Sequence, residues 1–580
     1  MRNFFTILYS TAFFVSGYAQ TITDHPLKKI NRPVQAMEFV VFHTDNSNSS
    51  NSPTKVTLGH YVRDSGLSAN VRIFQDHSYT NTTANNTTGS KSVNVITLDM
   101  NGDSYDEIVT AREKGNQVIL SMPQVQRNPL STVSDGPGEA INLGTIPSGA
   151  APQIKMAKGD FRRNGKEYFA IATPEFTLKK ISIDIFFYDS IAGYPSFCGH
   201  INADSLYFDG SNRPVGNLDI AINDFNGDSI PDIALAAFEK ESGGFRCYVK
   251  TFKVTPAPTD AYLNWTITAM GKQTVTSVGS NSTLENLAIS SGIYDSTAAP
   301  KKQIAVAVAY VDRNDNTLLH RKLFIASTAS GANGLNTVTV SANNYVSDQS
   351  NFNDFPAVAI VSGDFNSDAN EEIVLAFDNA LRVYSIGNNL VITPKASGSG
   401  GGITTGFNQL APNNSYLYIG DVDLDLENDV LIVTSHDDQN SQQYLTVTVL
   451  GVNPSLNTAT VKGSKNNLQQ ANFSGFGSNY RFAAAFGEFN GGRGILKAPV
   501  KSIRKILTPI VVNNSPPYHY DILGTDTADL TSCFPGSGFQ CNQNSQYKAV
   551  NQQSSTVETE LKSDWGVSGT LSAGGSVMGV

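Results

Sequence analysis

Charged residues are scarce in this chain. Only 16% of its 580 residues are Asp, Glu, Lys or Arg and 40% are hydrophobic, a composition typical of a folded protein. The formal net charge is -10 and no basic stripe occurs, so we expect no nucleic-acid partner. Long stretches of helical periodicity are also scarce, whereas Val, Ile, Thr, Tyr and Phe are plentiful. The sequence therefore predicts an all-β protein.

Long apolar runs are missing beyond the N-terminus, so no transmembrane segment is expected. Residues 1–19 combine a positive start at Arg2, an apolar stretch over Phe4–Val15 and a small-residue ending at Gly17–Ala19, which is typical of a cleaved signal peptide. The apolar stretch is too short for a membrane-spanning helix. We therefore expect a secreted protein, extracellular or at the cell surface, that begins at Gln20 after cleavage.

Cysteine is rare, with four residues in the whole chain. An even number in an exported protein is compatible with disulfides, and Cys533 and Cys541 are near enough in sequence to close a small loop. Cys198 and Cys247 would then form the second pair. Buried free thiols are the alternative, above all for Cys247, which lies in the strand-like run Phe245–Val249.

Familiar catalytic motifs are missing as well. The sequence has no His-Glu-x-x-His motif, no Gly-x-Ser-x-Gly elbow and no phosphate-binding loop. Its Ser/His/Asp cluster, Ser435-His436-Asp437, consists of neighbours in sequence, whereas a catalytic triad converges from separate segments. The sequence therefore favours a protein with no catalytic residues and no organic cofactor.

What the chain does contain is a recurring nine-residue loop. In the copy Asp224–Asp232, side-chain oxygens stand at positions one, three, five and nine, and Gly227 permits a tight turn. Calcium takes six to eight oxygen ligands at roughly 2.3–2.6 Å, and the backbone carbonyl of Ile230 at position seven would add one. Apolar strands are expected on both sides, over Leu218–Ile222 and Ile233–Phe238.

Three further copies keep these four positions, and weaker copies start at Asp160, Ile293 and Glu488. The seven starts lie 57 to 71 residues apart, a period that suits four short strands. The four complete copies predict about four Ca²⁺ sites. The predicted metal ligands are Asp99, Asn101, Asp103, Tyr105, Glu107, Asp224, Asn226, Asp228, Ile230, Asp232, Asp364, Asn366, Asp368, Asn370, Glu372, Asp421, Asp423, Asp425, Glu427 and Asp429.

Seven such units predict a seven-bladed β-propeller of four-stranded blades with calcium loops, followed by a short C-terminal β-rich extension. Closing the ring removes most exposed sheet edges. We expect the propeller over residues 34–523, with residues 34–90 either completing the last blade or forming an eighth, degenerate one. Residues 524–580 form the extension, and their composition suggests a chain that continues beyond Val580.

The pattern resembles the FG-GAP, or VCBS, repeat of integrin α-subunit propellers and of many bacterial exported proteins. Gly363-Asp364-Phe365-Asn366 and Asn223-Asp224-Phe225-Asn226-Gly227-Asp228 carry the resemblance best, and it extends over about Val93–Tyr520. It implies a non-catalytic propeller that binds an extracellular protein or glycan. Two alternatives stay open: a polysaccharide lyase or hydrolase that uses the propeller cleft, and the binding portion of a larger toxin or surface protein.

Calcium is expected to act structurally in such loops. Carboxylates packed this closely repel one another without a metal, so binding is expected to be coupled to folding of each blade. Each complete loop saturates its own ion and leaves no open position for a substrate. In the copy at Asp160, Arg162 and Lys166 stand where ligands belong, and a cationic side chain paired with Asp160 is expected to replace the ion.

Overall fold

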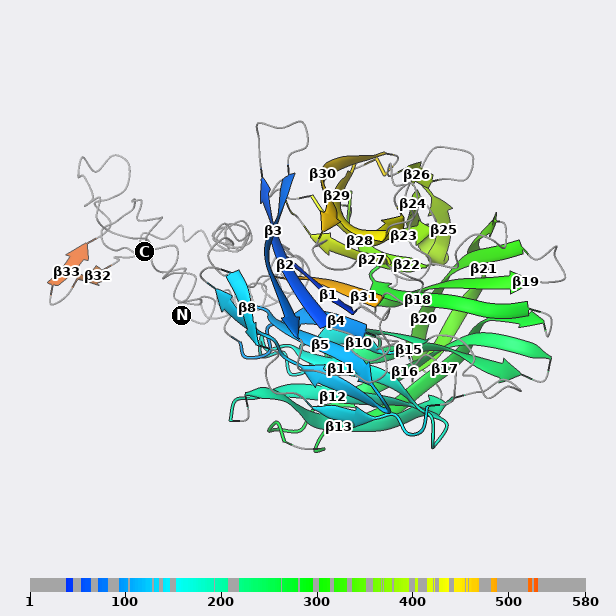
Figure 1. The fold of residues 1–580 in the computed structure, drawn as a ribbon, viewed down its shortest axis with the longest axis horizontal. Helices are drawn as coiled ribbons and strands as arrows, with labels where there is room; N and C mark the ends of the chain where they lie inside the picture. The colour runs from blue at the N-terminus through cyan, green and yellow to red at the C-terminus, as the bar shows by residue number, and fades with distance from the viewer. Residues whose placement is uncertain are drawn as a thin grey trace, which may run out of the picture. The chain divides into compact units, whose positions relative to one another are not determined.

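The fold was obtained as a computed structural model that shows an all-β chain (Figure 1). The described residues are 38–44, 54–63, 71–81, 93–102, 105–127, 130–134, 139–146, 153–191, 193–206, 218–241, 243–261, 263–279, 282–295, 302–312, 318–330, 336–350, 358–366, 368, 370–377, 380–395, 402–404, 415–420, 422, 427–437, 443–453, 455–456, 458–468, 481–487, 520–523 and 526–529. The predicted signal peptide, Cys533 and Cys541 lie outside them.

Seven antiparallel sheets of four strands each build a β-propeller, which confirms the predicted fold. Blade 1 contains β4 (Val93–Leu98), β5 (Glu107–Lys114), β6 (Gln117–Ser121) and β9 (Ala140–Asn142), with the hairpin β7 (Gln124–Arg127) and β8 (Leu130–Ser134) between the last two. Blade 2 contains β10 (Lys155–Gly159), β11 (Tyr168–Glu175), β12 (Lys180–Asp189) and β13 (Tyr194–Ser205).

Blades 3 and 4 repeat the same order. Blade 3 contains β14 (Leu218–Asn223), β15 (Asp232–Glu241), β16 (Gly244–Thr255) and β17 (Thr266–Gly279). Blade 4 contains β18 (Ser282–Gly292), β19 (Gln303–Asp312), β20 (Leu318–Ser330) and β21 (Asn336–Ser350). The strands predicted on both sides of the Asp224 loop are β14 and β15.

Blades 5 and 6 follow. Blade 5 contains β22 (Ala359–Gly363), β23 (Glu372–Phe377), β24 (Ala380–Gly387) and β25 (Val391–Pro394), with the 3₁₀ turn η2 (Asn388–Leu390) before β25, and the extra strand β26 (Gly402–Thr404) also pairs with β24. Blade 6 contains β27 (Ser415–Gly420), β28 (Asp429–Asp437), β29 (Gln443–Val452) and β30 (Ala459–Leu468).

Blade 7 combines strands from the two ends of the propeller. Its first strand is β31 (Arg481–Gly487), which pairs antiparallel with β1 (Glu38–Thr44), and β2 (Thr54–Arg63) and β3 (Val71–Asn81) follow outward. The N-terminal strands therefore complete the seventh blade and form no eighth one. The first strands of successive blades contact one another around the ring.

The hydrophobic core consists of seven clusters, one between each pair of neighbouring blades. Successive side chains of a strand point to opposite faces of its sheet, so a central strand contributes to two clusters. In β11, Ala170 and Ala172 face blade 3, whereas Phe169 and Ile171 face blade 1. This explains why the second strands read as continuous apolar runs and not as alternating ones.

The expected Cys198–Cys247 disulfide is wrong. Both thiols are free and fully buried. Cys198 lies in the cluster between blades 2 and 3, whereas Cys247 lies in the cluster between blades 3 and 4, so a sheet separates them. Burial raises the pKa of both thiols, which keeps them protonated and unreactive.

Contacts divide the chain into two units, one of which spans Val34–Ile495 and holds the propeller. The other unit joins Met1–Pro33 to Leu496–Val580, and within it the structure describes the hairpin β32 (Tyr520–Leu523) and β33 (Asp526–Asp529). A helix with the length and apolarity needed to cross a bilayer is not found in the described part of the chain.

Candidate functional site

The recurring loops join the first strand of a blade to its second strand. The complete copies lie between β4 and β5, β14 and β15, β22 and β23, and β27 and β28. Because each loop has the same place in its blade, all of them lie on one face of the ring. Four predicted ligands, Asp103, Asp421, Asp423 and Asp425, lie outside the described residues.

The Asp224 loop is held together by its own side chains. The carboxylate of Asp224 accepts hydrogen bonds from the backbone N–H groups of Gly227 at 2.6 Å and Ser229 at 2.7 Å. Gly227 has φ of +83°, which a glycine adopts at little cost. This arrangement curls the loop so that positions three, five and nine face one another.

The amide of Asn226 is where these positions meet. Its Nδ2 donates to Asp228 Oδ2 at 3.1 Å and to Asp232 Oδ1 at 3.3 Å. In blade 5, the Nδ2 of Asn366 donates to Asp368 Oδ2 at 3.0 Å and to Glu372 Oε1 at 3.1 Å. The structure thus brings positions three, five and nine together in both loops.

The first loop shows part of the same arrangement. Asn101 Nδ2 donates to Glu107 Oε1 at 2.7 Å, and Asp99 accepts the backbone N–H of Gly102 at 2.7 Å. Of the remaining predicted ligands, Tyr105, Ile230, Asn370, Glu427 and Asp429 are described, and Ile230 and Asn370 each donate a backbone N–H to the carboxylate at position five.

The side chain at position nine also has a purely structural task. Its oxygen accepts the backbone N–H of position two and thereby closes the loop. The bond recurs in five blades, from Met100 to Glu107 (2.9 Å), Phe225 to Asp232 (3.2 Å), Tyr294 to Gln303 (2.7 Å), Phe365 to Glu372 (3.0 Å) and Val422 to Asp429 (3.2 Å).

Gln303 is the member of this set that the sequence did not reveal. Its Oε1 accepts the N–H groups of both Tyr294 and Asp295. The loop of blade 4 is longer than nine residues, so counting nine positions from Ile293 misses it. A neutral amide in the place of a carboxylate shows that loop closure needs an acceptor oxygen and no negative charge.

Replacing Gln303 with leucine is expected to destabilise the protein by about 1–3 kcal/mol, because two buried N–H groups lose their acceptor. Equilibrium unfolding in guanidinium chloride measures the loss. Gln273→Leu, the same change at an exposed position of β17, is the matched control and should stay within about 0.5 kcal/mol of the parent. Equal midpoints for the two variants would show that Gln303 does not close the loop.

The electrostatics of the Asp224 loop favour a bound cation. Asp232 is fully buried, and this burial, together with the charges of Asp228 and Asp224, raises its pKa to about 8. Burial also acts to raise the pKa of Asp228, but the hydrogen bonds from Lys253, Ile230 and Asn226 together with the Lys253 charge outweigh it, and the pKa is lowered. A cation beside Asp232 would therefore favour its charged form.

The donor set of the loops can be judged against the ligands that a metal ion needs. Within the described segments, no group of three or more His, Cys, Asp or Glu side chains is arranged so that it could hold an ion. The chemistry of the donors nevertheless fits calcium, because all of them offer oxygen. A rotation of the Asn226 amide by half a turn would bring its carbonyl oxygen toward the carboxylates of Asp228 and Asp232, at the cost of the hydrogen bond that this oxygen accepts from Asp228 N at 2.7 Å.

Neighbouring loops are linked by hydrogen bonds around the ring. The backbone carbonyl at position one accepts a bond from position eight of the next blade. The donors and acceptors are Glu167 N to Asp99 O (2.7 Å), Lys302 N to Asp224 O (3.1 Å), Glu371 N to Ile293 O (2.7 Å) and Asn428 Nδ2 to Asp364 O (2.7 Å). Between blades 2 and 3 position eight is Pro231, which has no N–H to donate.

Arg162 does not replace an ion beside Asp160, contrary to expectation. The carboxylate of Asp160 is already used by the backbone N–H groups of Asn164 and Gly165 in its own loop. The guanidinium reaches into blade 3 instead, where its Nε lies 2.8 Å from Asp260 Oδ1 and its Cζ lies 5.5 Å from the centre of the Trp265 ring. Arg162 therefore connects two blades.

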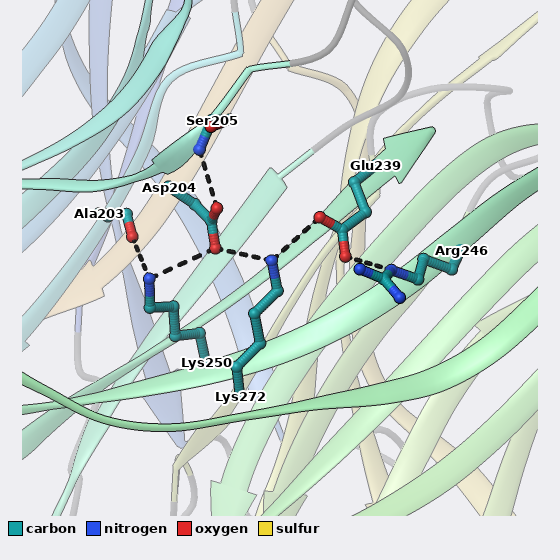
Figure 2. A network of polar contacts seen from close by, with 7 residues as sticks. All are labelled: Ala203, Asp204, Ser205, Glu239, Arg246, Lys250 and Lys272. Atoms are coloured by element: carbon teal, nitrogen blue, oxygen red, sulfur yellow. Dashed lines mark hydrogen bonds and ion pairs between the residues drawn. The ribbon is translucent and has the colours of Figure 1, made fainter. Parts of the chain in front are cut away.

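A second polar network joins blades 2 and 3 (Figure 2). Lys272 Nζ lies 2.9 Å from both Asp204 Oδ2 and Glu239 Oε2, and Lys250 Nζ donates to the carbonyl of Ala203 at 2.6 Å. Arg246 forms an ion pair with Glu239. Each charge in this network faces an opposite one, so we assign it to the attachment of the two blades and not to acid–base chemistry.

His200 and Asp184 form a pair on neighbouring strands of blade 2, with 2.6 Å between Nδ1 and Oδ1. Burial raises the pKa of Asp184, and the hydrogen bond that His200 donates to Asp184 raises the pKa of His200. The Ser435-His436-Asp437 cluster lies in the regular strand β28.

The fold therefore defines a seven-bladed β-propeller with a ring of polar loops on one face. No protein-family model matches the chain. No curated protein matches it either.

Three solved propellers illustrate the structural likeness. A mutant Aleuria aurantia lectin bound to Fucα1-6GlcNAc shares 9% identity over 66% of this chain and 98% of its own, with a TM-score of 0.34. An Agrocybe aegerita lectin specific for non-reducing terminal N-acetylglucosamine shares 13% identity over 77% and 94%, with a TM-score of 0.41. The α-L-arabinofuranosidase of Fusarium graminearum shares 8% identity over 62% and 93%, with a TM-score of 0.33. At these values the likeness carries no argument about function.

Proposed function

We propose that this protein is a calcium-stabilised β-propeller of the FG-GAP (VCBS) repeat type. On this proposal it is secreted and acts as a non-catalytic binding module for an extracellular protein or glycan. The observation that carries the proposal is the Asp224 loop, where Asn226, Asp228 and the fully buried Asp232 converge.

Calcium would be held by the oxygens of positions one, three, five and nine, and it would supply the positive charge that the buried carboxylate needs. The same convergence in the Asp364 loop supports a repeated role. Because position nine also accepts the N–H of position two, binding and loop closure would use the same side chain. We therefore assign the ion to stabilisation of the blades.

A binding role fits the arrangement of the polar groups. The ion pairs described at the boundary of blades 2 and 3 are mutually satisfied and connect the two sheets. The loops between strands lie on the faces of the ring, and strand pairing does not constrain their side chains. We therefore place the recognition of a partner on these loops.

Isothermal titration of the metal-free protein with CaCl₂ tests the proposal, and we expect about four binding events. A variant with Asp364→Asn and Asp368→Asn should lose one of them. A glycan array and affinity capture of purified extracellular proteins, each with calcium and with EDTA, then test for a partner. The absence of any heat of binding would overturn the calcium assignment, and cleavage of polysaccharides by the purified protein would overturn the non-catalytic one.

A further inference from the structure

A lysine from another strand already lies at the Asp224 loop. Lys253 belongs to β16, the third strand of blade 3, and its Nζ lies 2.7 Å from Asp228 Oδ2. Asp228 stands at position five, where its carboxylate also receives the Asn226 amide. The ammonium group thus already contacts an oxygen that, on the proposed function, would bind calcium.

In blade 6, too, a lysine from an outer strand contacts a carboxylate of the loop. Lys462 of β30 places its Nζ 2.8 Å from Oδ1 of Asp429, the fully buried residue at position nine. The lysine passes over Gly451 of the neighbouring strand, where an added Cβ would come within 2.5 Å of Lys462 Cε. A glycine in this place leaves the lysine room to reach the loop.

Blade 5 has no lysine in the corresponding place. Ile233 of blade 3 pairs with Phe252, and Ile373 of blade 5 pairs with Tyr384, so Ser385 corresponds to Lys253. The Asp364 loop otherwise repeats the contacts of the Asp224 loop. The two loops therefore offer similar oxygens and differ at this position of the third strand.

We propose that Lys253 is a built-in competitor of calcium, which weakens calcium binding at the Asp224 loop and keeps this loop closed when calcium is withdrawn. The inference rests on the proposed calcium function. A tethered ammonium group and a calcium ion cannot hold the same carboxylate oxygen in the same way, so the lysine must turn away before the ion binds. Blade 5 has Ser385 in the place of Lys253, so this particular cost is confined to the Asp224 loop.

The test compares Lys253→Met with Lys240→Met in the full-length protein. Methionine keeps an unbranched apolar stem and removes the charge. Lys240 is an exposed lysine on β15 of the same blade and provides the same change in net charge. Calcium titration by calorimetry and thermal unfolding in EDTA are measured for both variants and for the parent.

We expect Lys253→Met to tighten one calcium site by up to about fivefold, the upper end of what an exposed ion pair is worth, and Lys240→Met to leave every site unchanged. In EDTA, Lys253→Met should melt at a lower temperature than Lys240→Met. If the parent binds calcium and Lys253→Met binds it with the same affinities, the competitor role is wrong while the calcium function stands. If the parent binds no calcium, both are wrong.

Discussion

Replacing Phe225 with alanine is expected to lower the free energy of unfolding by about 3–5 kcal/mol, because the substitution leaves a cavity in the hydrophobic core. Phe225 stands at position two of its loop, has no exposed surface and belongs to the cluster between blades 3 and 4. Its backbone carbonyl also accepts a hydrogen bond from Thr328 in blade 4. The residue therefore attaches the loop to the neighbouring blade from two sides.

Position two is apolar and buried in every copy that the structure describes. The side chains concerned are Met100, Phe161, Phe225, Tyr294, Phe365 and Val422, each exposed by 2% or less. Equilibrium unfolding in urea measures the effect of Phe225→Ala. Ile191→Ala, at a residue that is 97% exposed, serves as the control and should change stability by less than about 0.5 kcal/mol. A loss of the same size for both would refute the role of position two.

Removing calcium is expected to give the second large effect. A ligand that binds only the folded state adds about 2.7 kcal/mol per site when its free concentration is a hundred times its dissociation constant. Calorimetric scans in EDTA should therefore show a clearly lower melting temperature than scans with saturating calcium. The proposal predicts that all complete loops contribute to this shift.

Magnesium is the appropriate control for that experiment. It prefers octahedral geometry and keeps bound water, so it should restore little of the lost stability at the same concentration. The variant with Asp364→Asn and Asp368→Asn should respond less to calcium than the parent, since one loop has lost two of its proposed ligands. Identical melting temperatures in EDTA and in calcium would contradict a stabilising ion.

Local repetition in the sequence was sufficient to predict the fold. The recurrence of an apolar strand, a polar loop and a second apolar strand is a property of chain neighbours, and it predicted the seven blades. The convergence of Asn226, Asp228 and Asp232 is likewise visible within nine residues. Whether these residues hold calcium stays a prediction, as does the role of Asp421, Asp423 and Asp425, which lie outside the described residues.

Contacts between separate strands were not predictable in the same way. Lys253 meets Asp228 only because β16 lies beside β15, and Arg162 meets Asp260 only because two blades adjoin. The predicted Cys198–Cys247 disulfide was wrong for the same reason, because the sequence does not show that a sheet lies between the two residues. The loop of blade 4 has an insertion, so a fixed spacing of nine residues does not predict that Gln303 closes it.

The closure of blade 7 has a consequence for synthesis of the chain. The register pairs Glu38 with Gly487 and Thr44 with Arg481, so the first and last strands of the propeller are neighbours in space. A ribosome releases β1 long before β31, and during that interval Phe39 and Val41 lack the partner strand that covers them. The ring can therefore be completed only after nearly five hundred residues have been made, and any premature stop before Arg481 leaves an open sheet edge.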